Sequence, residues 1–272
     1  MTAVQPSPAD GYVLELRGLF AETDKCLQLL WRRRAVLIMA VVTLGLIYLM
    51  IQFFVGGGRL DDAVIASTLP GLVAYTLAST AALQGAGGVA EEINGGTMEQ
   101  VQLSIVPAQV LVLGRVGVLA LEGLTPAVVL TVAFWAGFGL HYTVSPGVLV
   151  PLLLTAIDAM AYGLLMVALT TAVSSIGALT HVFNMMVMFF GGMFVPVTTF
   201  PHGIQIFARV IPTTLGVQAM NASLAGQGLG ASWSNGVLPW LLVHIVAAGG
   251  LGAAAYMFTI RQARRGSGLR PR

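Results

Sequence analysis

The feature that most constrains this chain is a series of long apolar runs, each of about 20 residues or more. An α-helix needs about 20 predominantly apolar residues to cross the ~30 Å hydrocarbon core of a bilayer. Only 9% of the 272 residues are charged, against about 25% in an average globular protein. We therefore predict an all-α membrane protein with six spans, at residues 35–55, 64–89, 113–139, 147–173, 182–200 and 237–260.

The chain divides into three parts around these spans. Residues 1–34 are predicted to form a cytoplasmic tail, in which an amphipathic helix at 12–31 lies on the membrane surface, because its apolar residues recur at a 4-3-4-3 spacing. Residues 35–260 form one six-helix membrane domain, and 261–272 form a basic tail. A solvated leader helix is the alternative for 12–31, and no cleavable signal peptide is predicted.

The basic residues predict the orientation of the chain. Eleven of the thirteen Lys and Arg residues lie before the first span, after the last, or at Arg115, whereas Arg59 and Arg209 fall on the other side. Positive charge concentrates on the cytoplasmic side of membrane proteins, so both termini and residues 91–107 are predicted to be cytoplasmic. No basic patch interleaved with aromatic residues indicates a nucleic-acid partner.

Residues 91–107 form a polar segment between the second and third spans. Thr97 and Gln100 have the spacing of a helix capping box, and Pro107 stops that helix or starts the next. We expect a short cytoplasmic helix that offers a surface to another protein, with a solvated turn as the alternative.

Motifs for ATP binding and for common hydrolases are absent from the sequence. A P-loop needs a lysine after its glycines, and the only lysine, Lys25, stands between Asp24 and Cys26. H-E-x-x-H, C-x-x-C and G-x-S-x-G motifs do not occur either. The chain is therefore predicted not to be an enzyme and to carry no cofactor of its own.

Two stretches resemble the ABC-2 family of transporter permeases. The first has acidic residues followed by Gly-Thr-x-Glu, an apolar pair and a proline, at Glu91, Glu92, Gly96, Thr97, Glu99, Val101, Leu103 and Pro107. The second runs from Gly191 to Pro196 and continues with Phe200-Pro201 and Ile211-Pro212-Thr213-Thr214. It is similar to the fifth span of the family and to the short external re-entrant helices that follow it.

This resemblance implies a half-transporter in a bacterial cytoplasmic membrane that works as an exporter of drugs, lipids or other amphiphiles. Two permeases, identical or sister chains, would pair in the bilayer, and a separate ATPase subunit carrying ATP and Mg²⁺ would dock under each. The ATPase-coupling helix would comprise Glu91, Glu92, Gly96, Thr97, Met98, Glu99, Gln100 and Val101. An external gate would comprise Pro196, Pro201, Phe207, Ile211 and Pro212.

The sequence departs from the family pattern at two places. Ile93 and Asn94 stand where members often have an arginine among the acidic residues of the loop. Ala219-Met220-Asn221 stand where many carry an arginine after the external helices. Ion pairs of those arginines are therefore not carried over.

Acidic and polar residues inside the spans are candidates for the substrate pathway, because a charged group at mid-membrane is costly, and methionines are candidates because they pack adaptably against varied cargo. The candidates are Glu122, Asp158, Asn184, Met185 and Met188. For Glu122 and Asp158 the alternative is a protonated acid bonded to Ser, Thr or backbone. His181, Met185 and Met188 share a helix face that could carry Cu(I), but flexible packing is favoured and no metal site is predicted.

Other functions remain open at this point. A proton-coupled secondary transporter or channel could use Glu122 and Asp158, and a non-transporting scaffold for a sensor is a further alternative. His141, His202 and His244 are interpreted as interfacial or packing residues.

Overall fold

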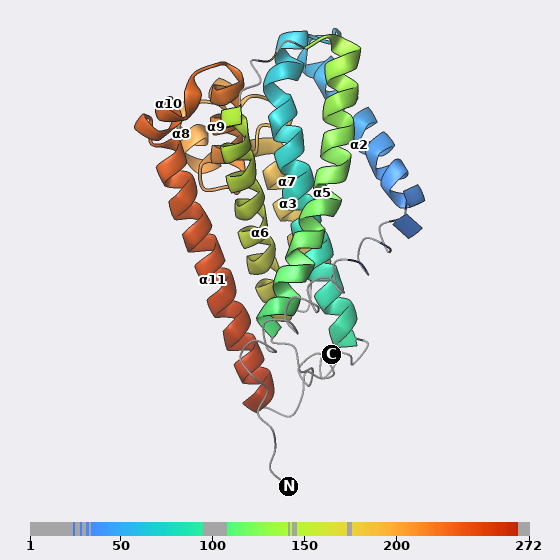
Figure 1. The fold of residues 1–272 in the computed structure, drawn as a ribbon, viewed down its shortest axis with the longest axis vertical. Coiled ribbons are helices and arrows are strands. Elements are labelled where there is room, and N and C mark those ends of the chain that lie inside the picture. Colours follow the sequence, from blue (N-terminus) through green and yellow to red (C-terminus); the bar gives the residue numbers. More distant parts are fainter. Residues whose placement is uncertain are drawn as a thin grey trace.

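The computed structural model describes residues 34–94, 108–140, 142, 146–172 and 176–265, together with Asp24, Gln28, Trp31 and Arg32. Every regular element in these residues is helical (Figure 1). This agrees with the predicted all-α class. The N-terminal helix at 12–31 falls mostly outside the described residues, as do the ends of both tails.

The helices run in chain order and are joined by short turns. Their bounds are α2 Arg34–Val55, α3 Asp62–Asn94, α5 Ala108–Phe138, η1 Pro146–Val148, α6 Leu149–Ala172, α7 Ile176–Phe190, η2 Val197–Thr199, α8 His202–Ala208, α9 Thr214–Leu224, α10 Gly228–Ser234 and α11 Val237–Arg265.

Four segments within the described residues are long and apolar enough to cross a membrane. They are Arg34–Val55, Asp62–Ala82, Pro146–Leu169 and Val237–Ala255. Two shorter apolar helical segments are Glu122–Phe138 and Thr180–Phe190. The structure thus supports a multi-pass membrane protein, while the count of six spans stays a prediction.

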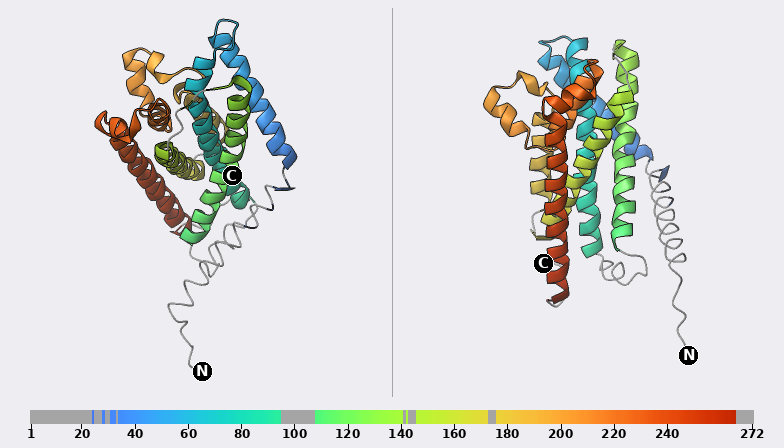
Figure 2. Two further views of the ribbon diagram at one scale, coloured as in Figure 1. Left: turned by 45° about the horizontal axis from the view of Figure 1, so that its top comes forward. Right: turned by 60° about the vertical axis from the view of Figure 1, so that its left-hand side comes forward.

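The long helices stand side by side as a bundle. Helix α2 lies at one edge and α11 at the other, with α3, α5 and α6 between them (Figures 1 and 2). Helix α3 packs against α5, α6 and α7, and α11 packs against α6. The lower ends of α3, α5 and α11 point to the same end of the molecule (Figure 1), so Asn94, Ala108 and Arg265 share one end of the bundle.

A proline inside α3 creates an unusual set of contacts. Pro70 has no N–H, so the carbonyl of Ala66 loses its helical donor. The hydroxyl of Tyr142 donates to that carbonyl at 3.0 Å. The side chain of Asn221 in α9 donates to the next carbonyl, that of Ser67, at 2.9 Å. Two distant segments thus satisfy the backbone at the proline.

The predicted fifth span at 182–200 is misplaced at both ends. Helix α7 begins at Ile176 and ends at Phe190. The apolar run continues to Val195, but Gly191 and Gly192 end the helix, and Gly192 adopts a φ of 84° that favours glycine. Hydropathy registers the apolar residues and not this turn, which accounts for the error.

Candidate functional site

The segment between α7 and α11 folds into four short helices at one end of the bundle (Figure 1). Pro196 precedes η2 and Pro201 precedes α8, each at the N-cap position. Proline suits a helix start because its missing N–H is not needed there. The structure therefore contains short helices where external re-entrant helices are expected.

Helix α9 is inserted into the bundle. It packs against α3, α6 and α11, and its buried residues are Thr214, Leu215, Gly216, Val217, Ala219, Met220 and Ser223. Gly216 makes this close approach possible, because a Cβ there would lie 1.9 Å from Oγ1 of Thr155 in α6. Helix α9 is therefore part of the core of the bundle and not a surface helix.

A tight turn at residues 209–213, the α8–α9 turn, connects α8 to this buried helix. Val210 and Ile211 close it by donating to the carbonyls of Phe207 and Ala208, both at 3.0 Å. Thr213 at its end has a φ of 74°, which is rare for a β-branched residue. Such a conformation persists only where the surroundings hold it.

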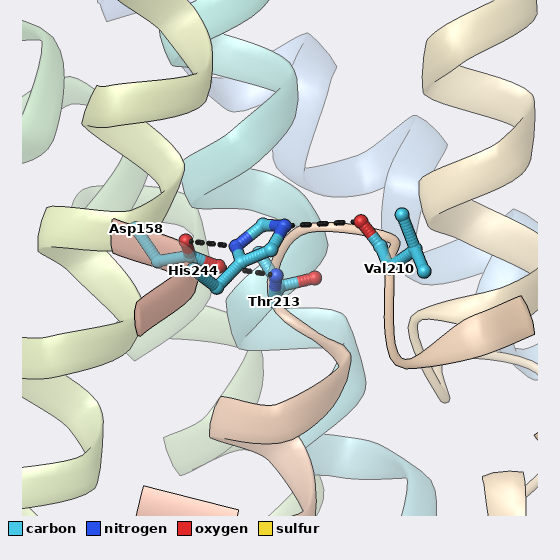
Figure 3. Close-up of polar contacts among 4 residues, drawn as sticks. All are labelled: Asp158, Val210, Thr213 and His244. Carbon is cyan, nitrogen blue, oxygen red and sulfur yellow. Dashed lines mark hydrogen bonds and ion pairs between the residues drawn. The ribbon is translucent and has the colours of Figure 1, made fainter. Parts of the chain in front are cut away.

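Asp158 is the group that holds Thr213. The carboxylate lies in α6, is 1% exposed, and accepts the backbone N–H of Thr213 through Oδ2 at 2.8 Å. Its other oxygen lies 2.6 Å from Nδ1 of His244 in α11 (Figure 3). Both oxygens are therefore engaged, and one side chain joins α6, α11 and the turn.

His244 completes the arrangement from the other side. Its Nε2 lies 3.0 Å from the carbonyl oxygen of Val210, so the ring bridges Asp158 and the α8–α9 turn (Figure 3). The interpretation of His244 as a mere packing residue is incomplete. Their pairing could have been predicted from their distances along the helix axes. Asp158 and His244 lie ~14 Å and ~11 Å from the first residues of α6 and α11, and these helices start at the same end of the bundle.

The other candidates for the external gate are split between surface and core. Phe207 is 47% exposed and stacks edge-to-face on Phe190, with ring centroids 5.4 Å apart. Ile211 and Pro212 are buried. The gate candidates therefore surround the α8–α9 turn, with Pro196 and Pro201 at the starts of the short helices before it.

The remaining pathway candidates do not form one cluster with Asp158. Asn184 in α7 is buried and donates to Oγ of Ser79 in α3 at 3.3 Å, and its own Oδ1 has no partner among the described residues. Met185 is exposed, whereas Met188 packs against a core formed by α2, α3 and α5. Glu122 is half-buried in α5.

The predicted ATPase-coupling helix lies largely outside the described residues. Glu91 and Glu92 belong to the last turns of α3. The positions of the others are not described: Gly96, Thr97, Met98, Glu99, Gln100 and Val101. The described residues also contain no group of three or more His, Cys, Asp or Glu side chains that could hold a metal ion.

Comparison with known proteins gives one finding. The family model described as ABC-2 type transporter matches residues 17–224, about three quarters of the chain. Neither the curated proteins nor the solved structures include a match. The match covers α2 to α9, including the α8–α9 turn and Asp158. The chain therefore belongs to the ABC-2 type transporter family, the membrane permeases of ATP-binding cassette transporters.

Proposed function

We propose that this permease exports a drug, lipid or other amphiphilic molecule through a bacterial cytoplasmic membrane, driven by a separate ATPase subunit. The family match over residues 17–224 carries the proposal. The sequence has no P-loop, so ATP and Mg²⁺ would bind to the partner. Two permease chains, identical or sister, would pair in the bilayer, with both termini in the cytoplasm.

Helix α3 offers a mechanical route from the cytoplasmic loop to the external segment. It is 33 residues long, ends at Asn94 next to the predicted coupling helix, and packs against three other long helices. Near its other end, Gly71 touches the backbone of Gly192, where a Cβ would lie 2.2 Å from the carbonyl oxygen. A push on residues 96–101 would therefore reach the turn after α7 through one rigid element.

The cargo would pass between the two permeases and leave near the short external helices. Asn184 and Glu122 would offer polar contacts, and Met185 and Met188 adaptable apolar ones. Asp158 would act through the turn instead, because both of its oxygens are occupied. Displacement of the α8–α9 turn would open the exit.

The test is purification of the tagged full-length protein from its host in mild detergent, followed by identification of co-purifying chains and an ATPase assay. We expect a nucleotide-binding subunit with the native chain, and its loss or uncoupling in Glu99→Ala/Gln100→Ala. Asp62→Ala/Gln227→Ala is the matched control, because it removes one acid and one amide from exposed positions at the other end of the bundle. Purification without any ATPase would contradict the proposal.

A proton-coupled secondary transporter or channel is the second candidate, because Asp158 and His244 form a pair that can bind and release a proton. The two functions differ in their energy source. Transport by a secondary transporter would persist in a strain that lacks the ATPase subunit, whereas export by the proposed complex would stop.

A further inference from the structure

The hydrogen bonds around His244 fix how many protons the Asp158–His244 pair holds. A carbonyl oxygen can only accept, so Nε2 of His244 must carry the hydrogen that it donates to Val210. The short contact between Nδ1 and Asp158 then needs one further proton, either on the ring or on the carboxyl. In both cases the pair shares that single proton and has no net charge.

Removal of the shared proton would break this arrangement. The ring would then hold one hydrogen for two acceptors, the Asp158 carboxylate beside Nδ1 and the Val210 carbonyl beside Nε2, and the carboxylate is the stronger acceptor. With the hydrogen on Nδ1, Nε2 has none, so the Val210 carbonyl loses its donor. The same carboxylate accepts the N–H of Thr213 and so holds the left-handed backbone of that residue in place. The turn would then lose its support from α11, while the Thr213 N–H stays bonded to the carboxylate in α6.

We propose that the proton shared by Asp158 and His244 keeps the α8–α9 turn docked, so that loss of the proton on the external side releases the turn (Figure 3). His244 is a positioning residue here, because it acts on the turn and not on cargo. The proton would exchange through His244, since its side chain is 21% exposed while that of Asp158 is 1% exposed.

Few other charges compete with the pair. Helices α9, α10 and η1 carry no titratable side chain, and the charge that acts on His244 is that of Asp158. His202 on α8, Arg209 directly after it and His181 on α7 are exposed. The other titratable groups on the packed helices are Tyr75, Glu122 and Tyr162 within the bundle and Asp62, Glu91, Glu92, Arg115, Tyr256, Arg261, Arg264 and Arg265 toward helix ends.

The experiment measures whether the turn becomes accessible as pH rises. In a Cys26→Ser background, a single cysteine replaces the buried Ile211. A membrane-impermeant maleimide labels the full-length protein in lipid nanodiscs from about pH 6 to about pH 10, a range that begins near the ordinary titration of histidine at about pH 6.5. The rate is divided by that of Gln227→Cys, an exposed site, to remove the pH dependence of the thiol itself. Ala208→Cys, also at a buried site, serves if Ile211→Cys does not fold.

The native Asp158–His244 pair should give a normalised rate that rises about tenfold toward high pH, the effect of losing a charge-assisted hydrogen bond. Asp158→Asn should stay slow at every pH, because its amide can donate to Nδ1 while its oxygen still accepts from Thr213. Asp158→Ala should label rapidly throughout. His202→Gln, an exposed histidine on the same segment, should keep the native pH profile.

A flat profile with the native pair, or a rise that persists in Asp158→Asn, would overturn the proposal. The gating role rests on the proposed export function, but the labelling needs neither cargo nor ATPase. The two proposals can therefore fail separately. If the turn opens as pH rises but the protein purifies without an ATPase, the export function is refuted and the proton-dependent turn stands.

Discussion

At the scale of single residues, a glycine in α9 lets this helix pack closely into the bundle. Gly216 lies on Thr155, whose hydroxyl donates to the carbonyl of Pro151 at 2.6 Å and is fully buried. Thr155 cannot turn aside without giving up that bond. The position therefore excludes every residue larger than glycine unless α9 moves away from α6.

Gly216→Ala should destabilise the protein by ~1–3 kcal/mol, the usual cost of overpacking a well-filled core. Thermal unfolding in detergent measures the change. The matched control is Gly230→Ala in α10, where an added Cβ meets nothing within 4 Å. This variant should be neutral or more stable by up to ~1 kcal/mol, because alanine restricts the unfolded chain. Equal losses in both variants would show that the α9–α6 contact is not tight.

At the scale of elements, the backbone hydrogen bond that α3 loses at Pro70 is replaced by a contact from another element. Tyr142 in the turn before η1 supplies the donor that the Ala66 carbonyl lacks, and Asn221 in α9 donates to the neighbouring carbonyl of Ser67. Burial raises the pKa of Tyr142 to about 12, so its hydroxyl stays a neutral donor at every ordinary pH. The proline thereby ties α3 to the turn between α5 and α6 and to the external segment.

Tyr142→Phe should lower stability by ~1–3 kcal/mol, because it leaves the Ala66 carbonyl without a donor. In a Pro70→Ala background the restored N–H at position 70 can donate to the Ala66 carbonyl. The same substitution should then cost only ~0.6 kcal/mol, the average of interhelical hydrogen bonds in membranes. The double-mutant cycle is measured by thermal unfolding. Equal costs in both backgrounds would contradict the proposed replacement of that hydrogen bond.

At the scale of the whole molecule, sequence patterns predicted the positions of the long helices well and the contacts between them poorly. Helices α2, α3, α5, α6 and α11 each contain or match a predicted span, because apolar length and turn residues mark where a helix crosses a membrane. The pairing of Asp158 with His244 was missed, since hydropathy gives no direction around the helix axis. Helix α9 was not predicted as a core element, because a helix of 11 residues is too short to register as a span.

The central claim is that an ATPase subunit docks on residues 96–101, and a site-specific cross-link tests it most directly. A photo-reactive amino acid replaces Gln100 in one variant and Gln227 in another, both within the full-length protein in its host. We predict a cross-link to a nucleotide-binding subunit from position 100 and none from position 227. A cross-link from position 227 alone, or none from position 100 while the ATPase co-purifies, would contradict the account.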